Sequence, residues 1–336
     1  MKKAWIFLIV LLSTCVLAFS GGQQGGSAAA DAKPVKLVGA TMLPEGHVFE
    51  RGLSYFAELV EKYYDGPVEI DIHHSGDLGQ EKDFFEYMMQ GVSVDFAVVS
   101  PDWMATWDKR VSFLGSPFIW RDLDHWNKGL KAGVFKPIEE ELLNKTGVRI
   151  LGYFGGGTRN LILKKRVETM DDLSTVLMRV PGAPIYIKVF ESTGIKPTPL
   201  PYLEVYNAIK TGVIDGLENE ASSMAQMKFY EVAPFVILSR HTITTRPICF
   251  SEKRLETLPP ALRQAILKAG AEAAQWARDT ESSEDNQFLK KLEDEGKITL
   301  VEFDNSEMIK KAYPVIEDFA KELGAEDILA KINSIN

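Results

Sequence analysis

The run VKLVGATMLPEGHVFERGLSYFAELVEKYYDGPVEIDIH, residues 35–73, determines the fold class. Residues 35–40 form a short apolar segment that is typical of a strand. Residues 49–60 carry apolar side chains at helical spacing, and a Gly-Pro pair then ends the helix. Residues 68–73 alternate as a strand does. A strand, a helix and a second strand in this order predict a mainly parallel sheet with helices on its faces.

The same alternation continues along the chain. The further predicted elements, in chain order, are helix 81–90, strand 96–99, helix 135–143, strand 148–154, strand 176–180, helix 183–193, helix 204–210 and strands 232–238 and 248–250. The triple glycine 155–157 predicts a turn from the preceding strand into a loop. These elements indicate an α/β protein.

A long helix is predicted from Leu258-Pro259-Pro260 to about Glu295. At 1.5 Å per residue it would be roughly 50–57 Å long, more than the width of one small domain. Its two ends are apolar and its centre, residues 279–286, is polar. This pattern is typical of a helix that bridges two lobes and has a solvent-exposed central segment. Two helices broken near residues 280–283 fit the pattern equally well.

Composition excludes several classes of function. The 336 residues include 47 acidic and 38 basic side chains, so the net charge is −9. Without a basic cluster we expect no nucleic-acid binding. The sequence contains no hydrolase, phosphate-loop or zinc-protease motif. His73 and His74 are adjacent on a strand and point to opposite faces, which makes a poor metal pair. We therefore expect no catalytic residues, no metal and no cofactor.

The N-terminus predicts export. Two lysines precede an apolar run at residues 4–19 that is too short to span a bilayer comfortably, so residues 1–20 are interpreted as a signal peptide cleaved after Ser20. A loose lipobox ending at Cys15 is the alternative and would lipidate that residue. Residues 21–34 are interpreted as a flexible linker. The mature protein is expected to be soluble outside the cytoplasm.

Two arginines lie in unusual surroundings. Arg179 ends an apolar strand and Arg159 follows the triple glycine. A buried guanidinium needs an anionic partner or a wet cleft, because an unpaired buried charge is very costly. Ligand sites in α/β sheets collect at the carboxyl ends of strands, where both arginines are expected. The planar guanidinium suits a carboxylate ligand. A structural ion pair is the alternative for each.

Five motifs carry a resemblance to a known family. In order they are Gly157-Thr158-Arg159, Met170-Asp171-Asp172-Leu173, Met178-Arg179-Val180-Pro181, Tyr202-Leu203-Glu204-Val205-Tyr206 and Gly212-Val213-Ile214-Asp215-Gly216-Leu217-Glu218-Asn219. Together they resemble the substrate-binding subunit of TRAP (tripartite ATP-independent periplasmic) transporters, the DctP-like family. The resemblance extends over residues 35–336.

The resemblance implies a two-lobed periplasmic solute-binding protein fold with a long helix that bridges the lobes. Lobe I would comprise residues 35–156 and 245–284. Lobe II would comprise residues 157–244 and 285–336. The lobes would close on a small organic anion.

The resemblance also implies ligand-binding residues. Arg179 would clamp the ligand carboxylate, Arg159 would add a second cationic contact, and Asn219 would donate its amide to the same group. Tyr202 would pack against the ligand. Glu220 replaces a proline that is frequent in the family, and this departure affects the contacts expected at the far end of the ligand.

Three further residues are candidates at the cleft. His47 and Glu81 would lie where the first lobe faces it, and His241 could order water near the ligand. A purely structural role stays open for each of them.

The function expected from these features is that of an extracytoplasmic receptor. It would bind a small organic acid, a sugar acid such as a uronate or aldonate first, and deliver it to the membrane subunits of a TRAP transporter. A C4-dicarboxylate or 2-oxo acid is the alternative ligand. From other classes, an extracytoplasmic enzyme on such acids and a ligand-sensing subunit of a signalling receptor stay open. We expect a periplasmic monomer that is not an enzyme.

Overall fold

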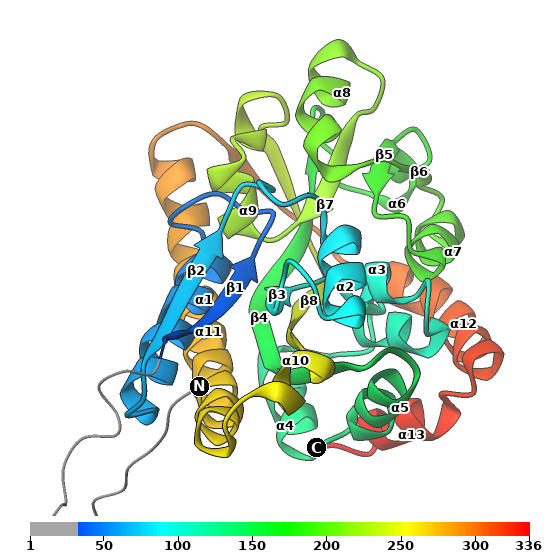
Figure 1. Ribbon diagram of the computed structural model, residues 1–336. Coiled ribbons are helices and arrows are strands. Elements are labelled where there is room, and N and C mark those ends of the chain that lie inside the picture. The colour runs from blue at the N-terminus through cyan, green and yellow to red at the C-terminus, as the bar shows by residue number, and fades with distance from the viewer. Residues whose placement is uncertain (1–32) are drawn as a thin grey trace, which may run out of the picture. The chain divides into compact units, whose positions relative to one another are not determined.

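The computed structural model describes residues 33–336. The predicted signal peptide, Cys15 and the predicted linker up to residue 32 lie outside these residues. Pro34–Asn336 forms one compact unit around a nine-stranded mixed sheet (Figure 1). The strands are β1 (Val35–Ala40), β2 (Val68–His73), β3 (Phe96–Val98), β4 (Val148–Leu163), β5 (Leu177–Val180), β6 (Lys196–Pro199), β7 (Gly216–Asn219), β8 (Phe235–Ser251) and β9 (Thr299–Glu302). The α/β prediction is confirmed.

The strand order is β2-β1-β3-β8-β4-β7-β5-β6, with β9 beside β8. The pairs β1–β2 and β1–β3 are parallel, as predicted. The pairs β5–β6, β5–β7 and β8–β9, which include strands that were not predicted, are parallel too. The centre is different, because β3–β8, β4–β8 and β4–β7 are antiparallel. The expectation of a mainly parallel sheet is therefore correct only for the flanks.

The two central strands are longer than predicted. β4 has 16 residues and passes through the triple glycine, so the turn predicted there is wrong. β8 has 17 residues and joins the two strands predicted at 232–238 and 248–250. Gly155 and Gly156 have φ values of 113° and 103°, and the β4–β8 register shifts between Gly155 and Thr158. A bulge of this kind bends a strand without ending it.

Helices cover the sheet. The α-helices are α1 (Val48–Tyr63), α2 (Glu81–Gln90), α3 (Pro101–Met104), α4 (Leu123–Lys131), α5 (Lys136–Thr146), α6 (Met170–Leu173), α7 (Pro184–Ser192), α8 (Val205–Thr211), α9 (Ala221–Gln226), α10 (Glu252–Thr257), α11 (Pro260–Asp294), α12 (Ser306–Leu323) and α13 (Glu326–Asn333). The short 3₁₀ helices are η1 (Lys109–Gly115), η2 (Tyr202–Glu204) and η3 (Phe229–Glu231). The predicted elements are present close to their predicted positions. The elements that were not predicted are β6, β7, β9, α3, α4, α6, α9, α10, α12 and α13.

Helix α11 is continuous over 35 residues, so the alternative of two broken helices is wrong. It packs against β4 and α1 (Figure 1). Glycines allow this close packing: a Cβ at Gly152 would lie 2.6 Å from the Cβ of Ala274, and one at Gly270 would lie 2.6 Å from the Cβ of Leu151. The centre of α11 is not fully wet as expected, because Glu281 is buried there.

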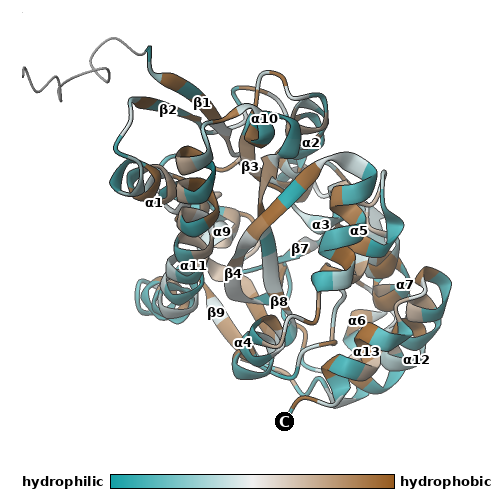
Figure 2. Cartoon of the chain, turned by 60° about the horizontal axis from the view of Figure 1, so that its bottom comes forward, coloured by the Kyte–Doolittle hydropathy of each residue, from teal (hydrophilic) through white to brown (hydrophobic). Residues whose placement is uncertain are grey.

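Apolar side chains fill the space between the sheet and the helices. Helices α5, α7 and α13 carry both hydrophilic and hydrophobic residues along their surfaces (Figure 2), as amphipathic helices at the edge of a core do. Phe96 of β3 stacks on Phe250 of β8 with ring centroids 6.0 Å apart. Among residues 33–336 no helix is long and apolar enough to cross a bilayer.

Candidate functional site

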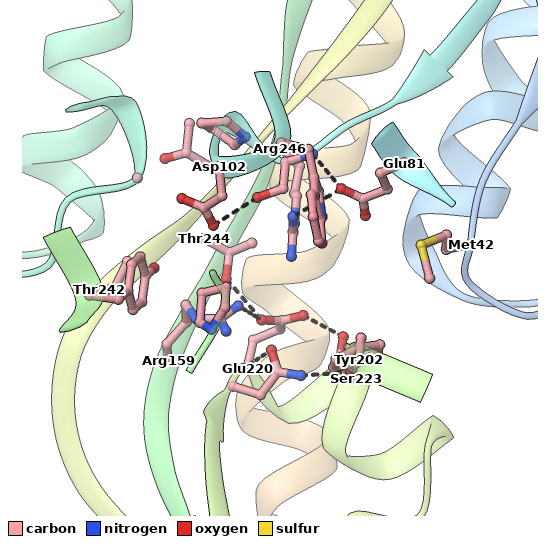
Figure 3. A pocket seen from close by; sticks show the side chains of 18 of the residues that line it. Met42, Glu81, Asp102, Arg159, Tyr202, Glu220, Ser223, Thr242, Thr244 and Arg246 are labelled. Carbon is pink, nitrogen blue, oxygen red and sulfur yellow. Dashed lines mark hydrogen bonds and ion pairs between the residues drawn. The ribbon is translucent and has the colours of Figure 1, made fainter. Parts of the chain in front are cut away.

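A cleft opens where the ends of several sheet strands meet helices α2 and α3 (Figure 3). It holds about 860 Å³ of empty space, open solvent included. Six charged side chains are the main polar groups that line it: Glu81, Asp102, Arg159, Arg179, Glu220 and Arg246. The cleft therefore brings together acidic and basic groups from sequence positions far apart.

Arg179 lies on β5 with its side chain in the cleft wall, and the residue is 5% exposed. Its Nε–H donates to the carbonyl of Leu200 at 2.9 Å, and its guanidinium lies 5.5 Å from the ring centre of Tyr202. No carboxylate of the described residues pairs with it, and its Nη groups make no hydrogen bond there. Burial lowers the pKa of Arg179. Its charge is uncompensated by any direct protein partner.

Arg159, on β4, is in the opposite situation. Its Nε and Nη2 donate to both carboxylate oxygens of Glu218 at 2.6 and 2.8 Å, and its Nη1 donates to Glu220 at 2.6 Å. A further bond joins Nη2 to the carbonyl of Glu218 at 3.0 Å. Burial raises the pKa of Glu218, but Arg159 and a hydrogen bond from His241 outweigh it and hold the value at about 2. Arg159 lines the cleft but is largely occupied by structural ion pairs.

Asn219 and Tyr202 lie side by side in the cleft wall. The Asn219 Nδ2 donates to the Tyr202 hydroxyl at 2.8 Å, and its Oδ1 accepts from the backbone of Glu220 at 3.1 Å. Asn219 is held at the end of β7 by pairing with Asn160 of β4. Burial raises the pKa of Tyr202, so its phenol stays neutral.

His47 and His241 are not among the residues that line the cleft. His47 caps α1, its Nε2 lies 3.2 Å from the Ser223 hydroxyl, and burial lowers its pKa to about 3. His241 lies between the Ser239 hydroxyl at 2.9 Å and Glu218 at 3.1 Å, and burial lowers its pKa. Both imidazoles support the buried ion pairs behind the wall.

Glu81, the third candidate from the first half of the chain, does line the cleft. It begins α2, accepts from the backbone of Ser100 at 2.6 Å, and lies 3.7 Å from the Arg246 guanidinium. The structure therefore gathers Arg159, Arg179, Asn219, Tyr202 and Glu81 around one space.

Sequence reasoning missed Arg246, Asp102 and Glu220. Arg246 is a charged residue within β8 that directly precedes the apolar run 247–250, a signal similar to the one that singles out Arg179. Asp102 lies a few residues after the carboxyl end of β3, and ligand sites in α/β sheets collect at such strand ends. Burial raises the pKa of Asp102 to about 6. Glu220 was noted only as a departure from a family motif.

The arrangement of these side chains fits the binding of an organic anion better than the catalysis of a reaction. Within residues 33–336 no group of three or more His, Cys, Asp or Glu side chains could hold a metal ion. Cys249 is buried against the core and burial raises the pKa of its thiol, so it is an inert residue there.

Comparison with known proteins agrees with this interpretation. Residues 39–322 match the DctP family model, described as bacterial extracellular solute-binding protein, family 7. A solute-binding protein of Sulfitobacter sp. strain NAS-14.1 is 45% identical over 92% of this chain and 93% of its own.

Two solved structures are similar over nearly the whole chain. One is a TRAP periplasmic solute-binding protein from Sulfitobacter sp. NAS-14.1 with bound α-D-taluronate, which has a TM-score of 0.86, 45% identity, and coverage of 89% of this chain and 97% of that one. The other is from Citrobacter koseri with bound D-glucuronate and has a TM-score of 0.83, 27% identity, and coverage of 90% and 99%.

Proposed function

Since the chain belongs to the DctP family of bacterial extracellular solute-binding proteins and has the two-lobed fold of TRAP solute receptors, we propose that it captures a sugar acid for a TRAP transporter. Uronates and aldonates are the favoured ligands. The relatives that carry taluronate and glucuronate support this choice.

One observation carries the proposal. Arg179 is a nearly buried cation in the wall of the cleft without a carboxylate partner among the described residues. A ligand carboxylate would supply that partner through charge-assisted hydrogen bonds worth about 1.5–3 kcal/mol each. A micromolar dissociation constant corresponds to about −8 kcal/mol, so such bonds would supply a large part of the affinity.

The other predicted residues take graded roles in this proposal. Asn219 and Tyr202 complete the carboxylate site beside Arg179, and Arg159 contributes the remaining N–H of its Nη1. Glu81 contacts the far end of the ligand. His47 and His241 act indirectly, by holding the buried carboxylates that position Arg159.

Capture would proceed by closure of two lobes, comprising residues 35–156 with 245–284 and residues 157–244 with 285–336. The pairing supports these boundaries, because β3 pairs with β8 only at 248–250, while β7 pairs with β4 only at 160–163. Ligand binding to groups of both lobes would favour the closed state.

The remaining attributes belong to the same proposal, and membership of the family supports export and transport. The protein would be exported to the periplasm by the signal at residues 1–20, act there as a monomer, and contact the TRAP membrane subunits. It would perform no chemistry on its ligand. A C4-dicarboxylate or 2-oxo acid remains the alternative ligand.

Calorimetry with residues 21–336 tests the proposal. We expect binding of at least one uronate or aldonate, and a loss of affinity of about 100-fold or more in Arg179→Ala, because two charge-assisted bonds disappear. Arg166→Ala is the matched control, since Arg166 is exposed and pairs only with Glu168. Unchanged affinity in a folded Arg179→Ala protein would refute the clamp, and ligand recovered chemically altered would favour an enzyme.

A further inference from the structure

The three arginines of the cleft differ in how their charge is compensated. Arg159 is paired with Glu218 and Glu220, and Arg246 lies 3.7 Å from Glu81. Arg179 alone has no carboxylate partner among the described residues. The protein thus leaves one cation of the cleft open to a ligand anion.

The side chains of Glu81, Asp102 and Arg246 lie on one side of the cleft, and Arg159, Glu220, Tyr202 and Ser223 lie on the other (Figure 3). The first side carries two carboxylates and one guanidinium, of which only Glu81 and Arg246 form an ion pair. The formal charge of this side is therefore −1 when both carboxylates are ionised.

Several polar atoms on that side can form further hydrogen bonds. The Arg246 guanidinium makes no hydrogen bond within the described residues, and its ion pair with Glu81 is long at 3.7 Å. Asp102 is partly buried; its Oδ2 accepts from the Ser100 hydroxyl at 3.1 Å, and its buried Oδ1 has no hydrogen-bond partner among the described residues. Glu81 uses Oε2 for the Ser100 backbone. The side therefore offers both acceptors and a donor.

We propose that the cleft accepts one carboxylate only, at Arg179, and recognises hydroxyl groups of the ligand with Glu81, Asp102 and Arg246. This rests on the proposed function and narrows it. The substrate class is a polyhydroxylated monocarboxylate, a uronate or aldonate, and the corresponding diacid, an aldarate, is rejected.

The selectivity has an electrostatic cause. A hydroxyl donates to one of the carboxylates and accepts from Arg246, so each buried polar group gains a partner. A second ligand carboxylate has no proton to donate, and it meets two like charges in a partly desolvated space. It also has to displace Glu81 from Arg246.

The test compares ligands that differ at one end only. Gluconate and glucarate share the same open chain and stereochemistry, and galactonate and galactarate form a second pair; glucuronate and galacturonate represent the ring forms. Dissociation constants are measured by calorimetry at pH 7.5, where Asp102 is ionised. We expect the monoacids to bind at least tenfold more tightly than the diacids.

Glu81→Gln is the decisive variant. Glutamine keeps an acceptor for the Ser100 backbone but removes the charge that compensates Arg246. The variant should bind the diacids at least tenfold more tightly than the wild type does and the monoacids more weakly. Glu86→Gln, on the exposed part of the same helix, should change neither. Asp102→Asn should likewise strengthen binding of the diacids relative to the monoacids. It takes the place of Glu81→Gln if thermal melting shows that Glu81→Gln is unfolded.

The outcomes separate the two proposals. Diacids that bind as well as monoacids in the wild type would overturn the single-carboxylate inference while leaving the receptor function intact. The inference would also be overturned if neither variant binds the diacids more tightly than the wild type does, because shape and not charge would then exclude the diacids. Binding of none of these acids would overturn the proposed function together with the inference.

Discussion

Glu281, in the middle of α11, carries a fully buried carboxyl group with no hydrogen-bond partner on either oxygen among the described residues. Burial raises its pKa well above the usual range, and the nearby charges of Glu220 and Asp285 raise it further. The buried site thus favours the protonated, neutral form of this carboxyl group. Gly157 makes room for it, because a Cβ there would lie 2.6 Å from Oε1 of Glu281.

This carboxyl should make stability depend on pH. Between pH 4.5, its usual pKa, and its higher native pKa, the native state binds a proton that the unfolded state releases. Stability should therefore fall as pH rises through this window, by up to about 1.4 kcal/mol per pH unit. Glu281→Gln removes the titration, so the free energy of unfolding of the wild type minus that of the variant should decline with pH.

Urea denaturation at a series of pH values above 4.5 measures this difference. Glu293→Gln, at an exposed position of the same helix, should show no such decline. A constant difference between the wild type and Glu281→Gln would mean that the buried carboxyl is charged or not buried in solution.

At the scale of elements, the bulge in β4 decides how the site is built. Gly155 and Gly156 adopt φ values that favour glycine, and they let β4 continue past the bend to Arg159. β8 pairs with β4 through this bend. It carries both Arg246, which lines the cleft, and His241, which does not. A strand ending at the glycines would leave Arg159 on a loop.

Gly155→Ala should destabilise the fold by about 2–6 kcal/mol, since positive φ and overpacking each cost roughly 1–3 kcal/mol. A Cβ at this position would lie 2.0 Å from the carbonyl oxygen of Thr244. Gly147→Ala is the control, because Gly147 also has a positive φ of 67° but nothing lies within 4 Å of its added Cβ. Equal losses in chemical denaturation would show that the close contact is relieved at no cost.

At the scale of the whole molecule, the two lobes are joined by several segments. β4 and β8 extend across the sheet, and α11 packs along β4. If the lobes move as proposed, these three continuous elements should limit the motion to a bend, and the β4 bulge is where we expect it. The proposed ligand contacts come from both lobes.

Addition of a bound uronate or aldonate should therefore lower the radius of gyration in small-angle X-ray scattering, because the acid links Arg179 on one side of the cleft to Glu81 and Arg246 on the other. Arg179→Ala with the same acid should keep the radius of the unliganded protein. Tight binding by calorimetry without any change in the radius would mean that the cleft is already closed before the ligand enters.

The sequence by itself determined the α/β class, the helices α1, α2, α5, α7, α8 and α11, and the strands β1, β2, β3 and β5. These followed from hydrophobic period and Gly or Pro breaks, which are local properties. It also singled out Arg159, Arg179, Tyr202 and Asn219, through charge in apolar segments and through ordered motifs. Arg246, which directly precedes the apolar run 247–250, carried a similar signal and could have been found from it.

Tertiary structure alone decided how the central strands pair and what each charge does. Local pattern does not distinguish a strand that ends at glycines from one that bulges, since the partner strand supplies the hydrogen bonds that continue it. Nor does it tell an arginine bound by carboxylates from an open one: Glu218 and Glu220 lie about 60 residues from Arg159 along the chain and within 2.6 Å of it in space. Pairing across such separations is a property of the fold, and it makes Arg179 the open cation of the cleft.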